Sequence, residues 1–96
     1  MTSSQNSEEF YQRFLKKLRI SHSWPSMYMF KFIMPTNSSY VDELILIFMD
    51  FDINISKKYS SNKKFLSISI NTRLDSPEEV INLYKKTSHF KGLIRL

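Results

Sequence analysis

The chain has no cysteine among its 96 residues and only one glycine, Gly92. Without cysteine it has no disulfides, thiolate metal ligands or cysteine nucleophiles. Phosphate-binding loops, dinucleotide fingerprints and nucleophile elbows each need at least two glycines at fixed spacing, so these are excluded as well. The longest apolar run, 44–49, has six residues, whereas a transmembrane helix needs ~20.

Residues 1–9 are polar and lack the apolar core of a secretory signal. Proteins without cysteine are common in reducing compartments, where disulfides do not form. We therefore expect a cytoplasmic protein that does not bind a membrane.

Basic residues outnumber acidic ones, 14 to 9, which gives a net charge of +5. Such a balance is typical of proteins that bind nucleic acid or another anionic partner. The chain also lacks alanine and is rich in Ile, Lys, Asn, Ser and Phe, a bias that AT-rich coding produces without selection for charge. We favour this compositional explanation, so charge alone does not assign a partner.

Hydrophobic periodicity predicts a tail and seven elements. Apolar residues recur every fourth position over 7–20, which predicts a helix, and alternate with polar residues over 64–74, which predicts a strand with one buried face. In chain order, we expect a disordered tail (1–6), a helix capped by Ser7 (7–20), a strand (27–34), a helix (40–50), two strands joined as a hairpin (53–59 and 64–74), a helix capped by Ser76, and a short strand (93–96).

This order predicts an α+β fold, a ferredoxin-like βαββαβ sandwich with an extra N-terminal helix. Right-handed crossovers would place two helices on one face of a four-stranded antiparallel sheet. The expected division is a tail over 1–6, an N-terminal helix over 7–23 and a ferredoxin-like domain over 24–96.

The part of this prediction that covers residues 24–96 agrees with a resemblance to the YbeD-like family of small uncharacterised bacterial proteins. The residues that carry it are Trp24-Pro25, Tyr28 to Pro35, Ser60 to Ile70, Ser76 to Ile81 and Lys91 to Ile94. The resemblance implies a ferredoxin-like fold similar to ACT-type regulatory domains, which bind amino acids, and it carries over no catalytic residues. Asn62 stands where the family usually has glycine, and asparagine tolerates a left-handed turn conformation.

ACT-type ligand sites also use a glycine in the turn after the first strand. Here that turn, 35–38, has none, which weighs against an amino-acid ligand because the backbone cannot approach it as closely.

No metal or catalytic site is expected. Asp50-x-Asp52-x-Asn54 begins like a calcium loop but lacks the glycine and glutamate that such a loop needs at its sixth and twelfth positions. His22 and His89 each follow a helix without a second ligand at i+3 or i+4. Glu78 and Glu79 fit a helix start, where Glu79 would close a capping box with Ser76. We expect neither a cofactor nor an enzymatic activity.

Two kinds of surface remain as candidates. Lysines gather around the hairpin, at Lys57, Lys58, Lys63 and Lys64, as an anion or partner contact or simply a solvated tip. Apolar residues outside the expected core form a candidate interaction surface: Phe10, Phe14, Leu18, Ile47, Met29, Ile33 and Phe65. We expect the N-terminal helix to dock onto the second helix or the open sheet face, of its own domain or of a second copy.

The leading hypothesis is a non-enzymatic regulatory or protein-interaction domain with two candidate partners, an unidentified protein or a second copy of the chain in a homodimer. The alternative is a nucleic-acid-associated protein that contacts the backbone through its basic residues. Paired aromatics on the open sheet face, which RNA-reading sheets use for stacking, are not evident in the sequence.

Overall fold

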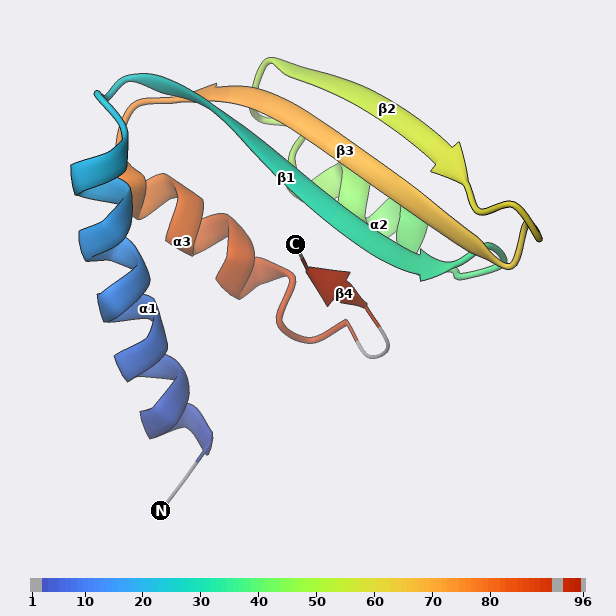
Figure 1. Ribbon diagram of the computed structural model, residues 1–96, viewed down its shortest axis with the longest axis horizontal. Coiled ribbons are helices and arrows are strands. Elements are labelled where there is room, and N and C mark those ends of the chain that lie inside the picture. The colour runs from blue at the N-terminus through green and yellow to red at the C-terminus, as the bar shows by residue number, and fades with distance from the viewer. Residues whose placement is uncertain (1–2, 91–92, 96) are drawn as a thin grey trace.

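The computed structural model describes residues 3–90 and 93–95 (Figure 1). Its elements are α1 (Ser3–Ser21), β1 (Ser26–Pro35), α2 (Tyr40–Ile47), β2 (Ile53–Tyr59), β3 (Phe65–Leu74), α3 (Pro77–Lys86) and β4 (Ile94–Arg95). The predicted element order and the α+β class are confirmed. Residues 1–2 of the expected tail, residues 91–92 and residue 96 lie outside the described part of the chain.

The sheet is antiparallel and has the strand order β2-β3-β1-β4. The ten-residue strands β1 and β3 form its long central ladder, from Ser26 opposite Leu74 to Pro35 opposite Phe65. β2 pairs along the free side of β3, and the two-residue β4 pairs with Phe32 and Ile33 of β1. β2 and β4 are therefore the two edges.

One face of the sheet forms the core. Phe30, Phe32 and Met34 of β1 alternate with exposed or half-buried residues, as period-two strands require. The Phe30 ring meets Phe48, just after α2, at 5.0 Å and Tyr84 of α3 at 5.1 Å between centroids. Both helices therefore pack on the same face of the sheet, and the other face is left open.

The N-terminal helix docks onto its own domain, as expected, but against α3. Figure 1 shows α1 running alongside α3 at one end of the sheet. Leu18 is buried in the core, and the Phe14 ring lies 5.7 Å from that of Tyr84. Neither the second helix nor the open sheet face, the two predicted acceptors, provides this contact, because α3 presents the nearer apolar surface.

Two helix boundaries differ from prediction. α1 begins at Ser3, four residues before the predicted cap Ser7, so the polar residues 3–6 extend a helix rather than form a tail. Once a helix is nucleated, each added residue gains a hydrogen bond, and weak helix formers can join it. α2 ends at Ile47 rather than Asp50, and Phe48 then donates its backbone N–H to the Ile45 carbonyl in a tighter turn.

The start of α3 is also built differently. Pro77 occupies the first turn as predicted, but the Ser76 side chain makes no capping hydrogen bond. Glu79 Oε1 accepts instead from the backbone N–H of Asp75, at 2.6 Å. The predicted capping box is therefore wrong in its partners, and the carboxylate closes the turn one residue earlier.

Candidate functional site: the open sheet face and basic hairpin

No described helix covers the open face of the sheet. Its outward residues follow from the register, which places Lys58, Ser67 and Ile33 in one row across β2, β3 and β1. The neighbouring rows are Ser56, Ser69 and Lys31, and Asn54, Asn71 and Met29. Phe65 faces outward at the hairpin end of β3 and is 47% exposed.

Charge on this part of the chain is entirely of one sign. From Ile53 to Leu74 the sequence has five basic residues, Lys57, Lys58, Lys63, Lys64 and Arg73, and no acidic one. β1 adds Lys31 and again no carboxylate. The acidic residues fall on the helices and on the loops before β2 and α3. An anionic partner would meet only cations across these three strands.

The hairpin tip is rigidly tied to the rest of the domain. Lys63 has φ of 60°, so it holds the left-handed position that was predicted for Asn62. Asn62 instead accepts a hydrogen bond through Oδ1 from the Lys64 backbone N–H, at 3.0 Å. Thr36, in the loop after β1, donates its hydroxyl to the Lys63 carbonyl at 2.7 Å and its N–H to the Lys64 carbonyl at 2.9 Å.

The four candidate lysines do not share one face. Lys58 lies on the open face, whereas Lys57 pairs with the buried Ile68 and therefore points to the helix side of the edge strand. Lys63 and Lys64 lie in the exposed loop between the strands. A charged residue pointing inward on an edge strand protects it from pairing with other chains, and this explains Lys57 without a ligand.

The apolar candidates separate into two groups. Leu18 is buried, and Phe14 and Ile47 pack against the core, so these belong to the fold rather than to a free surface. Met29, Phe65 and, on α1, Phe10 are about half exposed, and Ile33 is partly buried on the open face. The predicted interaction surface did not include the other exposed apolar side chains: Ile20, Met27, Leu46, Met49 and Tyr59.

A small hollow lies on the open face beside the hairpin. It has a volume of about 180 Å³ and is lined by Ile33, Lys58, Tyr59, Ser60, Phe65 and Ser67. Ser67 is short, while Lys58 and Ile33 on either side of it are long, so the row is lowest in its middle. The hollow can take one apolar side chain with a cation at its rim.

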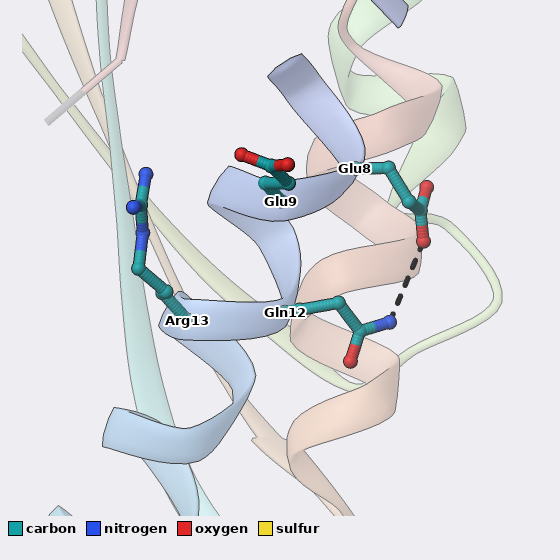
Figure 2. A pocket seen from close by; sticks show the side chains of 4 residues that line it. All are labelled: Glu8, Glu9, Gln12 and Arg13. Carbon is teal, nitrogen blue, oxygen red and sulfur yellow. Dashed lines mark hydrogen bonds between the residues drawn. The ribbon is translucent and has the colours of Figure 1, made fainter. Parts of the chain in front are cut away.

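A larger hollow of about 490 Å³ runs along α1, lined by Glu8, Glu9, Gln12 and Arg13. Figure 2 shows Glu8 and Gln12 pointing to one side of the helix and Arg13 to the other. Glu8 accepts a hydrogen bond from Gln12 and pairs with Lys85 of α3 at 3.5 Å. Because these side chains spread over a convex helix, this hollow does not gather groups around a ligand.

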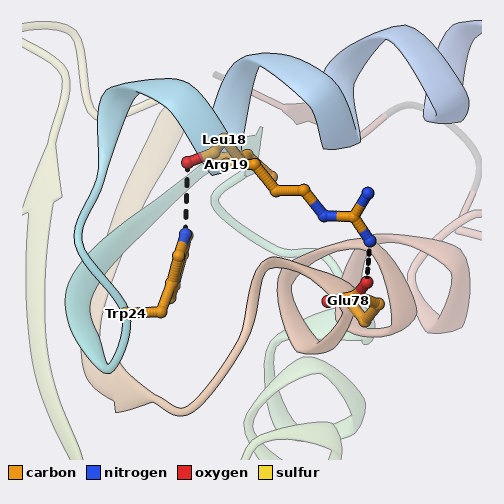
Figure 3. A network of polar contacts seen from close by, with 4 residues as sticks. All are labelled: Leu18, Arg19, Trp24 and Glu78. Atoms are coloured by element: carbon orange, nitrogen blue, oxygen red, sulfur yellow. Dashed lines mark hydrogen bonds and ion pairs between the residues drawn. The ribbon is translucent and has the colours of Figure 1, made fainter.

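Polar contacts fasten α1 to α3 and to the segment before β1. Arg19 forms an ion pair with Glu78, and the Trp24 indole N–H donates to the Leu18 carbonyl at 3.2 Å (Figure 3). The hydrogen bond from Arg19, followed by one from a backbone N–H, holds the pKa of Glu78 below its ordinary value of 4.5. Both groups are exposed, so this pair orients α1 rather than forming a reactive centre.

The described residues hold no group of three His, Asp or Glu side chains placed to bind a metal ion. His22 Nδ1 lies 3.4 Å from the Ser26 hydroxyl, and the His22 ring packs beside Trp24. His89 packs against Phe90 in the segment that follows α3. Within the same part of the chain, the helices are too short or too polar to cross a bilayer.

Comparison with known proteins agrees with this fold. No curated protein matches the sequence. The solution structure of the protein HP0495 from H. pylori is similar, with a TM-score of 0.62, 23% identity, and coverage of 79% of this chain and 86% of that one. At this identity the likeness shows a shared fold. A family model described as "Protein of unknown function (DUF493)" matches residues 20–94, so the chain belongs to the DUF493 family; most of α1 precedes the matched residues.

Proposed function

We propose that the protein is a non-enzymatic regulatory or protein-interaction domain that binds its partner through the open sheet face. The observation that carries this proposal is the uncovered face itself, which combines half-exposed Met29 and Phe65 with Lys31 and Lys58 and no carboxylate. Phe65 and Ile33 line the same hollow beside the hairpin, and contiguous exposed apolar surface can mark a binding site.

A ferredoxin-like assignment supports the same conclusion. The strand order β2-β3-β1-β4, read from the other edge as 4-1-3-2, and two helices on one face are the arrangement of the split βαβ motif. An open four-stranded sheet can bind a partner directly, as RNA-recognition sheets do through aromatic residues on their exposed face. Function assigned from fold alone is analogy, so the surface chemistry carries the proposal.

An amino-acid ligand of the ACT type is less well supported. The turn between β1 and α2 is closed by its own contacts, since Ser38 donates its N–H to the Pro35 carbonyl at 3.0 Å and Thr36 is bonded to the hairpin. These bonds occupy backbone N–H and carbonyl groups of the turn that a small ligand would need as hydrogen-bond partners.

The proposal is tested by affinity capture from the native lysate with three forms of the protein. We expect wild type to retain a specific protein and K31E/K58E to lose it. The matched control, K16E/K17E, changes the same charge on the exposed side of α1 and should retain it. Equal capture by all three forms would show that the open face is not the binding surface.

The acid-free stretch from Ile53 to Leu74 specifically favours a second candidate, a nucleic-acid-associated protein. Each phosphate neutralised on duplex DNA contributes about −0.9 to the slope of log affinity against log salt. Binding should therefore weaken steeply with salt, and K57S/K58S/K63S/K64S should flatten the slope. Absence of any shift with DNA or RNA at ~50 mM salt would end this candidate.

A further inference from the structure

The molecule carries a second exposed apolar surface, of opposite charge to the first. We call it the α2 stripe and define it by Asp42, Glu43, Leu46, Met49 and Asp50. Leu46 and Met49 are 64% and 63% exposed, the two highest fractions among the large apolar residues after Ile20. Positions 42, 46 and 49 are spaced by four and three, so they share one side of the helix and its following turn.

The carboxylates of the α2 stripe have no cationic neighbour along the chain. From Thr36 to Ser56 the sequence holds four acidic residues and no lysine or arginine. Among the described residues, the ion pairs join Arg19 to Glu78 and Lys85 to Glu8, and neither involves the stripe. The stripe is therefore an apolar ridge flanked by carboxylates that none of the described ion pairs engages.

The open-face patch, defined as Met29, Lys31, Ile33, Lys58 and Phe65, has the complementary form. Lys58 and Ile33 are two strand spacings apart, which is ~10 Å, with the short Ser67 between them. Ile33 and Lys31 border the short side chains of β3 on one side, and Lys58 borders them on the other. Single apolar side chains of a partner helix can therefore enter this row between cations.

One molecule cannot join its own two surfaces, because α2 packs on the core face of the sheet and the patch faces the other way. We infer that a second copy of this chain is the partner: the α2 stripe of one molecule lies in the open-face patch of the next, head to tail. This inference rests on the proposed function, since it names the partner of the same face.

The contact would be weak and sensitive to salt. α2 with its turn spans about 11 residues, or ~16 Å at 1.5 Å per residue, which places the interface at the small, transient end of protein contacts. Exposed charge pairs are screened beyond ~10 Å at 0.1 M salt. A head-to-tail interface also does not close on itself in a dimer, so association should continue with concentration.

The experiment is sedimentation velocity at ~50 mM salt over a range of concentrations. We expect wild type to associate increasingly with concentration and to dissociate in high salt. K31E/K58E breaks the patch and L46K/M49K breaks the stripe, so each should remain monomeric. Lysine suits the last turn of a helix, which keeps the second variant foldable. The matched control Q12K/I20K adds the same charge at two exposed positions of α1 and should associate like wild type.

Mixing the two monomeric variants gives the decisive result. Each retains the surface that the other has lost, so an equimolar mixture should form a one-to-one complex that does not grow further. Thermal melts of K31E/K58E and L46K/M49K, together with the milder variant K31Q/K58Q, check that the loss of association does not reflect unfolding. A wild type that is monomeric at all concentrations, or variants that do not form the mixed complex, would overturn the inference. Lysate capture lost in K31E/K58E would then still support the proposed function with a foreign partner, and binding of oligonucleotides instead would support the nucleic-acid candidate.

Discussion

The two faces of the sheet use alternate residues of the same strands for opposite purposes. On the helix side, Phe30 and Phe32 are fully buried among the rings of Phe48 and Tyr84. On the other side, Met29, the residue before Phe30, is half exposed, and Lys31 lies between the two phenylalanines. On the helix side, carboxylates and cations occur together and Arg19 pairs with Glu78, whereas the outward residues of the open side include cations and no carboxylate. Stability is therefore concentrated on one face, and binding capacity on the other.

Neighbouring residues of β1 give the sharpest test of this contrast. Phe30→Ala should lower the free energy of unfolding by about 3–5 kcal/mol, because it removes a fully buried ring and leaves a cavity. For a domain of this size that lowers the melting temperature by at least about 12 °C. Met29→Ala should change stability by less than ~1 kcal/mol. Similar melting curves for the two variants would contradict the division between the faces.

The same contrast exists on α1, where Leu18 is 3% and Ile20 is 87% exposed. Leu18→Ala should cost about 2–5 kcal/mol in a chemical denaturation experiment, as buried leucines do. Ile20→Ala is the control and should lie within ~0.5 kcal/mol of wild type. An unchanged midpoint for Leu18→Ala would mean that α1 does not pack on α3 in solution.

At the hairpin the comparison is between two adjacent loop residues. Lys63→Gly should raise the free energy of unfolding by about 0.5 kcal/mol, because glycine adopts φ near 60° without the steric cost that lysine bears. Asn62→Gly should lower it, because the acceptor for the Lys64 N–H is lost. Denaturant midpoints that move in the reverse directions would place the left-handed residue at Asn62.

The smallest effect concerns the Arg19–Glu78 pair on the helix side. Because the folded pKa of Glu78 is lowered, its stabilising contribution is complete above pH 4.5 and is lost as the pH falls through the folded pKa. In Arg19→Gln the pKa of Glu78 should return toward its ordinary value, as measured by NMR titration of its side chain. A titration curve identical to wild type would show that the ion pair does not form in solution.

The sequence predicted the elements well because their signals are local. The alternation at Leu66, Ile68 and Ile70 and the Ser-Pro-Glu-Glu start of α3 each need only a few neighbouring residues to be recognised. The candidate site was predicted in part: Met29 and Phe65 lie on the open face as expected. Leu18 and Ile47 were misplaced on a free surface, since burial depends on partners distant in sequence.

Local patterning by itself determined which segments are helices and strands, the absence of thiol and glycine-dependent chemistry, and the charge runs of opposite sign over 36–56 and 57–74. Tertiary structure decided that α1 packs on α3, that Lys63 takes the left-handed turn, and that Lys57 and Lys58 face opposite sides of the sheet. The physical reason is that periodicity fixes which side of an element is apolar, whereas register and packing against distant residues fix what that side meets.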